Sequence, residues 1–166
     1  MAFLDDENFS ELISDRDDQK RLLRLRSKTY IERKVRKSEF AKPEDGWYVL
    51  NDQLKRDVKL AKDKPHDEVF EDEVWGLLSK LGFNYLSSDR HLRLRYDKKD
   101  GSSQQIDVLA VDEECALLVE CKCAKGPAPK PASFKTEIES LGGKKAGLHR
   151  EISCLLYTSP SPRDRG

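Results

Sequence analysis

The stretch that decides the fold is residues 105–123, QIDVLAVDEECALLVECKC. Two apolar runs, 108–111 and 116–119, flank the short polar segment 112–115. Apolar and β-branched runs joined by a short polar turn are typical of neighbouring antiparallel strands. The stretch therefore predicts a β-hairpin whose two strands are largely buried.

Charged residues interrupt both predicted strands of this hairpin. Asp107 lies near the start of the first strand, and Glu120 and Lys122 lie near the end of the second. Because side chains two positions apart share one face of a strand, Glu120 and Lys122 are expected on one face and Cys121 and Cys123 on the core face. Burying a charge without a partner costs several kcal/mol, so these residues indicate paired or functional groups.

Two carboxylates beside a lysine form a site that suits a hard divalent cation. Mg²⁺ takes carboxylate oxygens, several waters and a substrate phosphate, and a nearby lysine can hold or help to deprotonate the attacking water. This chemistry predicts phosphodiester hydrolysis. The acid-x-Lys spacing is repeated in hydrophilic stretches, and only the copy at Glu120 and Lys122 lies in an apolar strand. The other copies are Asp18/Lys20, Glu32/Lys34, Asp57/Lys59 and Asp97/Lys99.

A helix and further strands are predicted before the hairpin. Apolar residues recur at helical spacing over 67–81, with Asp67 as the expected N-cap and Gly82 as the residue that ends the helix. The segments 83–86 and 92–96 read as one or two strands. Short turns between the strands predict an antiparallel meander.

A second helix is predicted after a linker at 125–132. Ser133 is its expected N-cap, and the helix covers 134–141, is interrupted at the Gly142-Gly143 pair and resumes to Ile152. The fold class expected is α/β, with a helix, an antiparallel strand meander and a second helix.

The placement of Asp107, Glu120 and Lys122 resembles the PD-(D/E)xK nuclease superfamily, although Ile106 stands where that family has proline. Phe70-Glu71, in a helix that ends at a glycine-aromatic step, is similar to Mrr-type and Holliday-junction-resolvase-like nucleases. The resemblance implies a restriction-endonuclease-like core over 67–153. The last strand of the family is missing from this core, and we attribute its absence to truncation.

The same resemblance implies roles for individual residues. Glu71, Asp107, Glu120 and Lys122 are the expected catalytic residues. The expected metal site, for Mg²⁺ or Mn²⁺, comprises Asp107, Glu120, Glu71 and Cys121. An alternative for Glu71 stays open, because it is one of several acids that a solvated helix face would carry.

The C-terminal segment 154–166 is expected to be an artefact. Residues 154–164, CLLYTSPSPRD, resemble the translation of a widely used transposon-type sequencing adapter. Such segments are set aside in fold reasoning. We therefore expect the natural chain to continue after about residue 153 into fused C-terminal domains.

The first 66 residues divide into segments that differ in charge and in their pattern of apolar residues. Residues 1–18 hold 7 acids, residues 20–42 hold 10 bases, and 1–45 is therefore predicted to be a charged arm, either extended or helical. The arm is interpreted as a contact for nucleic acid or as a solvated leader. Residues 46–66 are predicted to be peripheral strands or a linker.

Composition limits the class of protein. The 166 residues carry 31 Lys and Arg against 31 Asp and Glu, so net charge does not select a polyanionic partner. No apolar run approaches the roughly 20 residues that span a bilayer, and the acidic start is unlike a signal peptide, so a cytoplasmic protein without membrane contact is expected. Its cysteines are expected to be reduced and packed in the core rather than bound to zinc.

The leading hypothesis is a metal-dependent endonuclease-like module acting on DNA, part of a larger defence, restriction or repair protein. The alternatives are a domain of the same fold that binds nucleic acid without cutting it, and a structural domain with a satisfied polar cluster. Homodimerisation is left open. Basic residues after the motif are expected either at the rim of the cleft or in solvent, namely Lys125, Lys130, Lys135, Lys144, Lys145 and Arg150.

Overall fold

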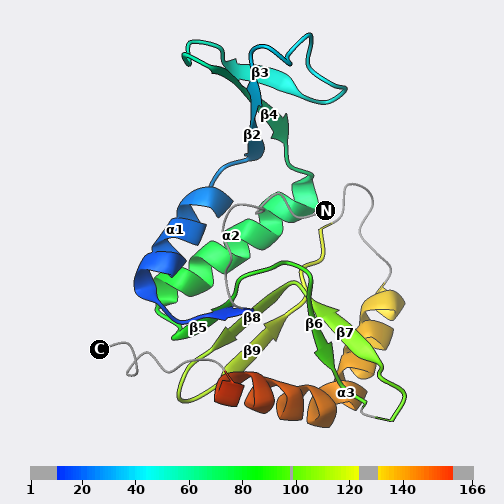
Figure 1. Cartoon of the computed structure of the whole chain (residues 1–166). Helices are drawn as coiled ribbons and strands as arrows, with labels where there is room; N and C mark the ends of the chain where they lie inside the picture. The colour runs from blue at the N-terminus through cyan, green and yellow to red at the C-terminus, as the bar shows by residue number, and fades with distance from the viewer. Residues whose placement is uncertain (1–10, 98, 124–130, 159–166) are drawn as a thin grey trace.

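The computed structural model describes residues 11–97, 99–123 and 131–158. These residues form a mixed α/β protein with antiparallel sheets and three helices (Figure 1). The helices are α1 (Arg16–Arg26), α2 (His66–Leu81) and α3 (Pro131–Thr158). The strands are β1 (Leu12–Ile13), β2 (Tyr30–Arg36), β3 (Tyr48–Asn51), β4 (Asp57–Asp63), β5 (Tyr85–Ser87), β6 (Leu92–Arg95), β7 (Ser103–Ile106), β8 (Val108–Val111) and β9 (Ala116–Val119).

The strands fall into three sheets. A central four-stranded sheet has the order β1-β5-β8-β9, and β6 pairs with β7 beside it. The third sheet has the order β2-β4-β3 and projects from the rest of the molecule beyond α1 and α2 (Figure 1). We call this three-stranded projection, residues Tyr30–Asp63, the wing.

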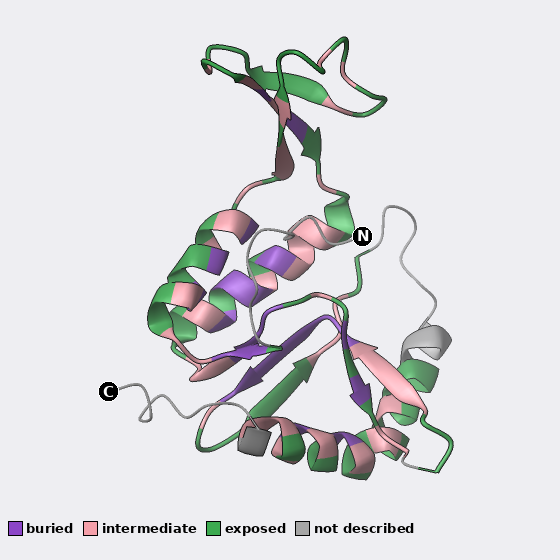
Figure 2. Ribbon diagram, in the orientation of Figure 1, coloured by how far each residue is buried: buried purple, intermediate pink, exposed green. Residues whose placement is uncertain are grey.

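The central sheet separates two hydrophobic clusters because side chains of β8 alternate between its faces. Val108 and Ala110 pack on the side of α1 and α2, around Trp75. Leu109 and Val111 pack on the side of β6, β7 and α3. β8 is therefore buried on both faces, as Figure 2 shows.

The predicted hairpin is present. β8 and β9 are antiparallel, with Val108 opposite Val119 and Val111 opposite Ala116. The strand predicted over 105–111 is, however, two strands, because the chain changes sheets at Asp107: β7 pairs with β6, and β8 pairs with β5 and β9.

The second strand of the hairpin is less buried than its sequence predicts. β9 lies at the edge of the central sheet, and Leu117 and Leu118 are each 38% exposed. The strand ends at Val119, so Glu120 and Lys122 follow it rather than lie within it. Cys121 is half-buried, whereas Cys115 and Cys123 are exposed, so the core position expected for Cys115 and Cys123 is wrong.

The first predicted helix is confirmed as α2. Gly82 ends it in the left-handed conformation, at φ 92°, with its N–H donated to the Ser79 carbonyl. The expected N-cap is wrong, because the helix begins at His66 after Pro65, and Asp67 lies in the first turn. An acidic side chain in that turn still interacts favourably with the helix dipole.

Residues 12–26 do not form a separate arm. β1 pairs with β5 in the central sheet, and Leu22 of α1 is fully buried in the cluster around Trp75. The apolar stripe of α1 therefore decides its packing in spite of the many charges. The acidic residues at 1–10 lie outside the described residues, and the peripheral strands expected in 46–66 are present as β3 and β4.

α3 runs without interruption through Gly142 and Gly143. The predicted break is wrong, because buried Leu148 and Ile152 hold the second half of the helix against the central sheet. The helix begins at Pro131, so Ser133 is not its N-cap, and its last residues include 154–158 of the expected artefact. That helical conformation does not test the origin of the segment, which stays a prediction.

Candidate functional site

The candidate site lies where β8 begins and β9 ends. Val108 is opposite Val119, so the next pair in register is Asp107 and Glu120. Directly opposite residues of an antiparallel pair point to the same face. The topology therefore places both acids on the same side of the hairpin, as the sequence predicts.

Asp107 is nearly buried, at 8% exposure. Its Oδ2 accepts a 2.7 Å hydrogen bond from the main-chain N–H of Cys121. Burial raises the pKa of the Asp107 carboxyl, the Cys121 N–H opposes that rise, and the negative charge of Glu120 adds to it. The negative charge of the Asp107 carboxylate is therefore only partly compensated by its neighbours.

Glu71, on α2, is within the electrostatic influence of Asp107. Burial raises the pKa of Glu71 to about 7, and repulsion by Asp107 adds to the rise. Arg90 opposes it, with Nε 3.9 Å from Oε2 of Glu71. A carboxyl group with a pKa near neutral pH, beside a second acid, is a feature of sites that bind cations or transfer protons.

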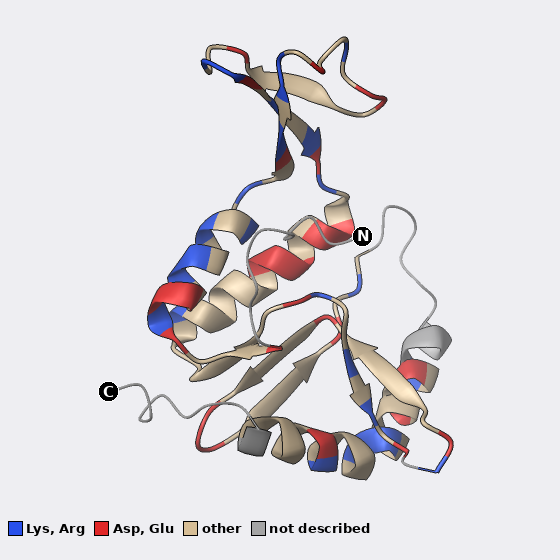
Figure 3. Cartoon of the chain, in the orientation of Figure 1, with Lys and Arg blue, Asp and Glu red and all other residues tan. Residues whose placement is uncertain are grey.

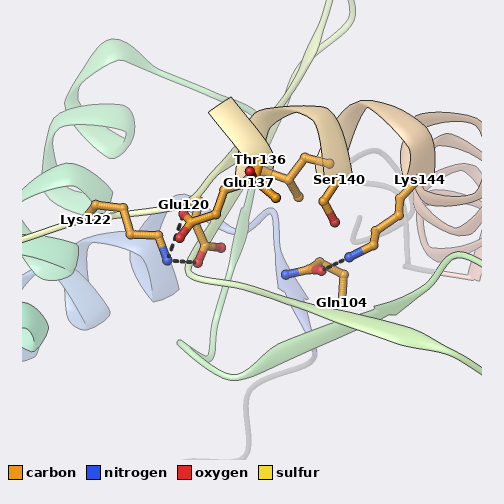
Figure 4. Close-up of a pocket in the computed structure, with 8 residues that line it drawn as sticks. Gln104, Glu120, Lys122, Thr136, Glu137, Ser140 and Lys144 are labelled. Atoms are coloured by element: carbon orange, nitrogen blue, oxygen red, sulfur yellow. Dashed lines mark hydrogen bonds and ion pairs between the residues drawn. The ribbon is translucent and has the colours of Figure 1, made fainter. Parts of the chain in front are cut away.

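Glu120 is engaged by Lys122 rather than by Asp107. The Lys122 ammonium lies 3.0 Å from Oε1 of Glu120 and 3.5 Å from Oε2 of Glu137 on α3 (Figure 4). The hydrogen bond to Glu120 raises the pKa of Lys122, which keeps the side chain protonated. These residues line a cavity of about 310 Å³ with Gln104 and Lys144.

The donor types of Glu71, Asp107 and Glu120 fit Mg²⁺ or Mn²⁺, which prefer carboxylate oxygens. Among the residues that the structure describes, no group of three or more His, Cys, Asp or Glu side chains is close enough to hold a metal ion. The expected convergence is therefore incomplete: Glu71 and Asp107 share one electrostatic environment, and Glu120 is directed towards Lys122.

Cys121 contributes to the candidate site through its main-chain N–H and not through its thiol. Burial, with repulsion from Asp107, raises the pKa of its thiol to about 11. The thiol is therefore protonated at neutral pH, whereas metal binding requires the thiolate. The N–H of Cys121 instead fixes one oxygen of Asp107.

A second polar cluster lies behind Glu71 and centres on Asp72. Asp72 is 3% exposed at its side chain and binds Arg26 at 2.9 Å, Lys64 at 2.8 Å and Arg90 at 2.6 Å. Arg90 also binds Glu68 at 2.7 Å. Sequence reasoning missed this cluster, although the three-residue spacing from Asp72 to Trp75 is a signal that both share the buried face of α2.

The basic residues that follow the motif have mixed surroundings. Lys144 donates a 2.8 Å hydrogen bond to Gln104 and lies 5.0 Å from the ring centroid of Tyr96. Lys135 lies 3.9 Å from Glu139. Lys125 and Lys130 lie outside the described residues.

Comparison with protein-family models, with curated proteins and with solved structures finds no match. The class that the structure defines is a mixed α/β fold with antiparallel sheets. The resemblance to PD-(D/E)xK nucleases stays a prediction from the sequence. Within the described part of the chain, no helix has the length and apolar character that crossing a bilayer requires.

Proposed function

We propose that the protein is a metal-dependent nuclease module that hydrolyses phosphodiester bonds in DNA, within a larger defence, restriction or repair protein. The observation that carries the proposal is the pair Glu71 and Asp107, a half-buried and a buried acid whose pKa values are both raised. Unneutralised carboxylates of this kind bind a cation favourably. Glu120 and Lys122 complete the set at the adjoining hairpin end.

Each residue has a role that follows from its position. Glu71, Asp107 and Glu120 would hold the ion, and Mg²⁺ or Mn²⁺ would supply a Lewis acid for the phosphate and for the attacking water. Lys122 is a cation that can donate a hydrogen bond to the developing charge on the phosphate. Lys122 contacts Oε1 of Glu120, so Oε2 is the oxygen that Glu120 would offer to the ion.

The test uses Asp107→Asn, which keeps an oxygen for the Cys121 N–H but removes the charge. Titration calorimetry with MgCl₂ and cleavage of supercoiled plasmid are measured on the same preparations. We expect the wild type to bind Mg²⁺ and cut, and the variant to lose both. Glu73→Gln, at an exposed position of the same helix, is the control and should retain both. Cleavage by Asp107→Asn at the wild-type rate contradicts the proposal.

The second candidate is a domain that binds nucleic acid without cutting it. It is favoured by the contact of Lys122 with both Glu120 and Glu137, which occupies an acid that the metal would need. This candidate predicts DNA binding in EDTA that added Mg²⁺ does not strengthen, and no cleavage under any metal. The same two measurements therefore distinguish it from the nuclease.

A further inference from the structure

A second cavity, of about 470 Å³, lies between the wing and the helices. Tyr30 and Trp47 line it from the wing, and Arg26 and Arg90 line it from the body of the protein. Its volume falls within the range of about 300–1,000 Å³ that is typical of small-molecule sites. It therefore has room for one ligand of nucleotide size.

Two of the four acids that line this cavity, Glu32 and Glu68, are paired with cations. Glu32 binds Lys28 at 3.0 Å and Lys59 at 2.7 Å. Asp63 accepts a 2.9 Å hydrogen bond from the Tyr48 hydroxyl, and Glu68 binds Arg90. The lining as a whole holds five Lys and Arg side chains against four Asp and Glu side chains, a small positive excess that favours an anionic ligand.

Two cations of the lining have hydrogen-bonding capacity in reserve. Arg26 is 5% exposed, and its Nε has no hydrogen-bond partner among the described residues. Lys62 is exposed and has no ion pair within that part of the chain. Buried donors without a partner are uncommon in native proteins and indicate a missing acceptor.

Trp47 supplies a flat apolar surface in the same cavity. The guanidinium of Arg33 lies 4.3 Å from the centroid of the Trp47 ring, which holds the ring in place. Bases of unpaired nucleic acid stack on such aromatic rings with little preference for sequence. Aromatic and cationic groups together are the chemistry that recognises a nucleotide.

The cavity adjoins the acidic site through shared residues. Arg90 lines the cavity and lies 3.9 Å from Glu71. His91 also lines the cavity, and its charge acts on Asp107. Figure 3 shows further Lys and Arg residues on β2, β4 and α1, around the elements that frame this cavity.

We propose that the cavity binds one unpaired nucleotide, with its base against Trp47 and its phosphate against Lys62, Arg90 and His91. The nucleotide belongs to a DNA strand whose next phosphodiester bond lies at Glu71 and Asp107, and this second statement rests on the proposed nuclease function. The wing then selects single-stranded or locally opened DNA over intact duplex.

Intrinsic fluorescence offers a direct test, because the chain has 2 tryptophans. Trp75 is fully buried and its indole N–H donates a 2.7 Å hydrogen bond to the Ser87 carbonyl, whereas Trp47 lines the cavity. Oligothymidylate is titrated into the full chain in EDTA, so that no cleavage occurs. We expect quenching of the wild type and none of Trp47→Phe. Wild-type quenching that persists in Trp47→Phe overturns the proposal.

Binding strength is then measured by the anisotropy of fluorescein-labelled oligothymidylate. Lys62→Glu should weaken binding by about tenfold or more, the loss of one well-placed contact. Lys80→Glu carries the same charge change at an exposed position of α2 outside the cavity and should bind like the wild type. Equal affinities of Lys62→Glu and the wild type overturn the proposal.

Two further ligands identify the source of the nucleotide. Quenching by thymidine monophosphate alone, without oligonucleotide binding, overturns the assignment to a strand. A blunt duplex that binds as tightly as oligothymidylate overturns the preference for unpaired DNA. Because these measurements contain no metal, they are independent of cleavage: oligothymidylate binding without plasmid cutting leaves the cavity proposal standing and contradicts only the nuclease.

Discussion

The main-chain N–H of Cys121 donates a 2.7 Å hydrogen bond to Oδ2 of Asp107 across the end of the hairpin. β9 has already ended at Val119, so this bond continues the strand pairing by a side chain instead of a carbonyl. It keeps the segment with Glu120 and Lys122 beside β8. It also leaves Oδ1 of Asp107 as the oxygen that can meet a ligand.

A substitution at Lys122 can separate the rate of DNA cleavage from the affinity for Mg²⁺. Lys122→Met keeps the length of the side chain but removes its charge, and should lower the rate of DNA cleavage by about 10²- to 10³-fold, a typical loss for a charge-stabilising group. Mg²⁺ affinity should be unchanged or higher, because Glu120 loses its ammonium partner. Single-turnover cleavage and calorimetry measure the two effects. Lys135→Met, at an exposed position of α3, is the control, and a wild-type cleavage rate for Lys122→Met would remove Lys122 from the site.

The raised pKa of Glu71 predicts a pH dependence of stability. The pKa is about 7 in the folded protein against an ordinary value of 4.5, so between these values the folded state binds more protons than the unfolded state. The free energy of unfolding contributed by Glu71 therefore falls as pH rises from about 4.5 to 7. Urea unfolding of wild type and Glu71→Gln should show this decline only in the wild type. Identical pH profiles would mean that Glu71 titrates normally.

Asp72 is expected to be essential for stability. Asp72→Asn leaves Arg26, Lys64 and Arg90 without their shared counter-charge in a buried place. Removing one partner of a buried ion pair costs about 3–5 kcal/mol, which urea unfolding measures. Glu73→Gln, the exposed neighbour, should change stability by less than about 0.5 kcal/mol. Equal unfolding midpoints for the two variants would show that solvent reaches the cluster.

Glycines of α3 should respond to alanine in opposite directions. A methyl group at Gly147 would overlap the main chain of Tyr96, so Gly147→Ala must displace the helix from the sheet and destabilise the protein by about 1–3 kcal/mol. No atom of the described residues lies within 4 Å of a methyl group at Gly142, so Gly142→Ala should raise stability by about 0.5–1 kcal/mol. Thermal unfolding compares them. A stabilised Gly147→Ala would contradict the close contact of α3 with Tyr96.

Local patterns were sufficient to predict the elements that carry the site. The continuous apolar run Val108–Val111 and the helical spacing over 67–81 each depend on near neighbours, and both elements form. The facing of Asp107 and Glu120 followed from the short turn between the strands. These features need no knowledge of distant contacts.

Other features depend on contacts between distant segments. Arg26 meets Asp72 across 46 positions of sequence, and no local pattern marks that pairing. The exposure of Leu118 depends on β9 lying at the sheet edge, which its apolar sequence does not reveal. The path of α3 through Gly142 likewise follows from the burial of Leu148 and Ile152 further along.

The wing leaves and rejoins the protein at one place. The Lys64 N–H donates a 2.9 Å hydrogen bond to the Thr29 carbonyl, and the Lys64 ammonium donates one of 3.2 Å to the Arg26 carbonyl. A segment with adjoining ends can be gained, lost or exchanged without disturbing its host. The wing is therefore suited to act as a cassette: a short linker from Thr29 to Lys64 can replace it, and unrelated recognition elements can be grafted at the same two residues.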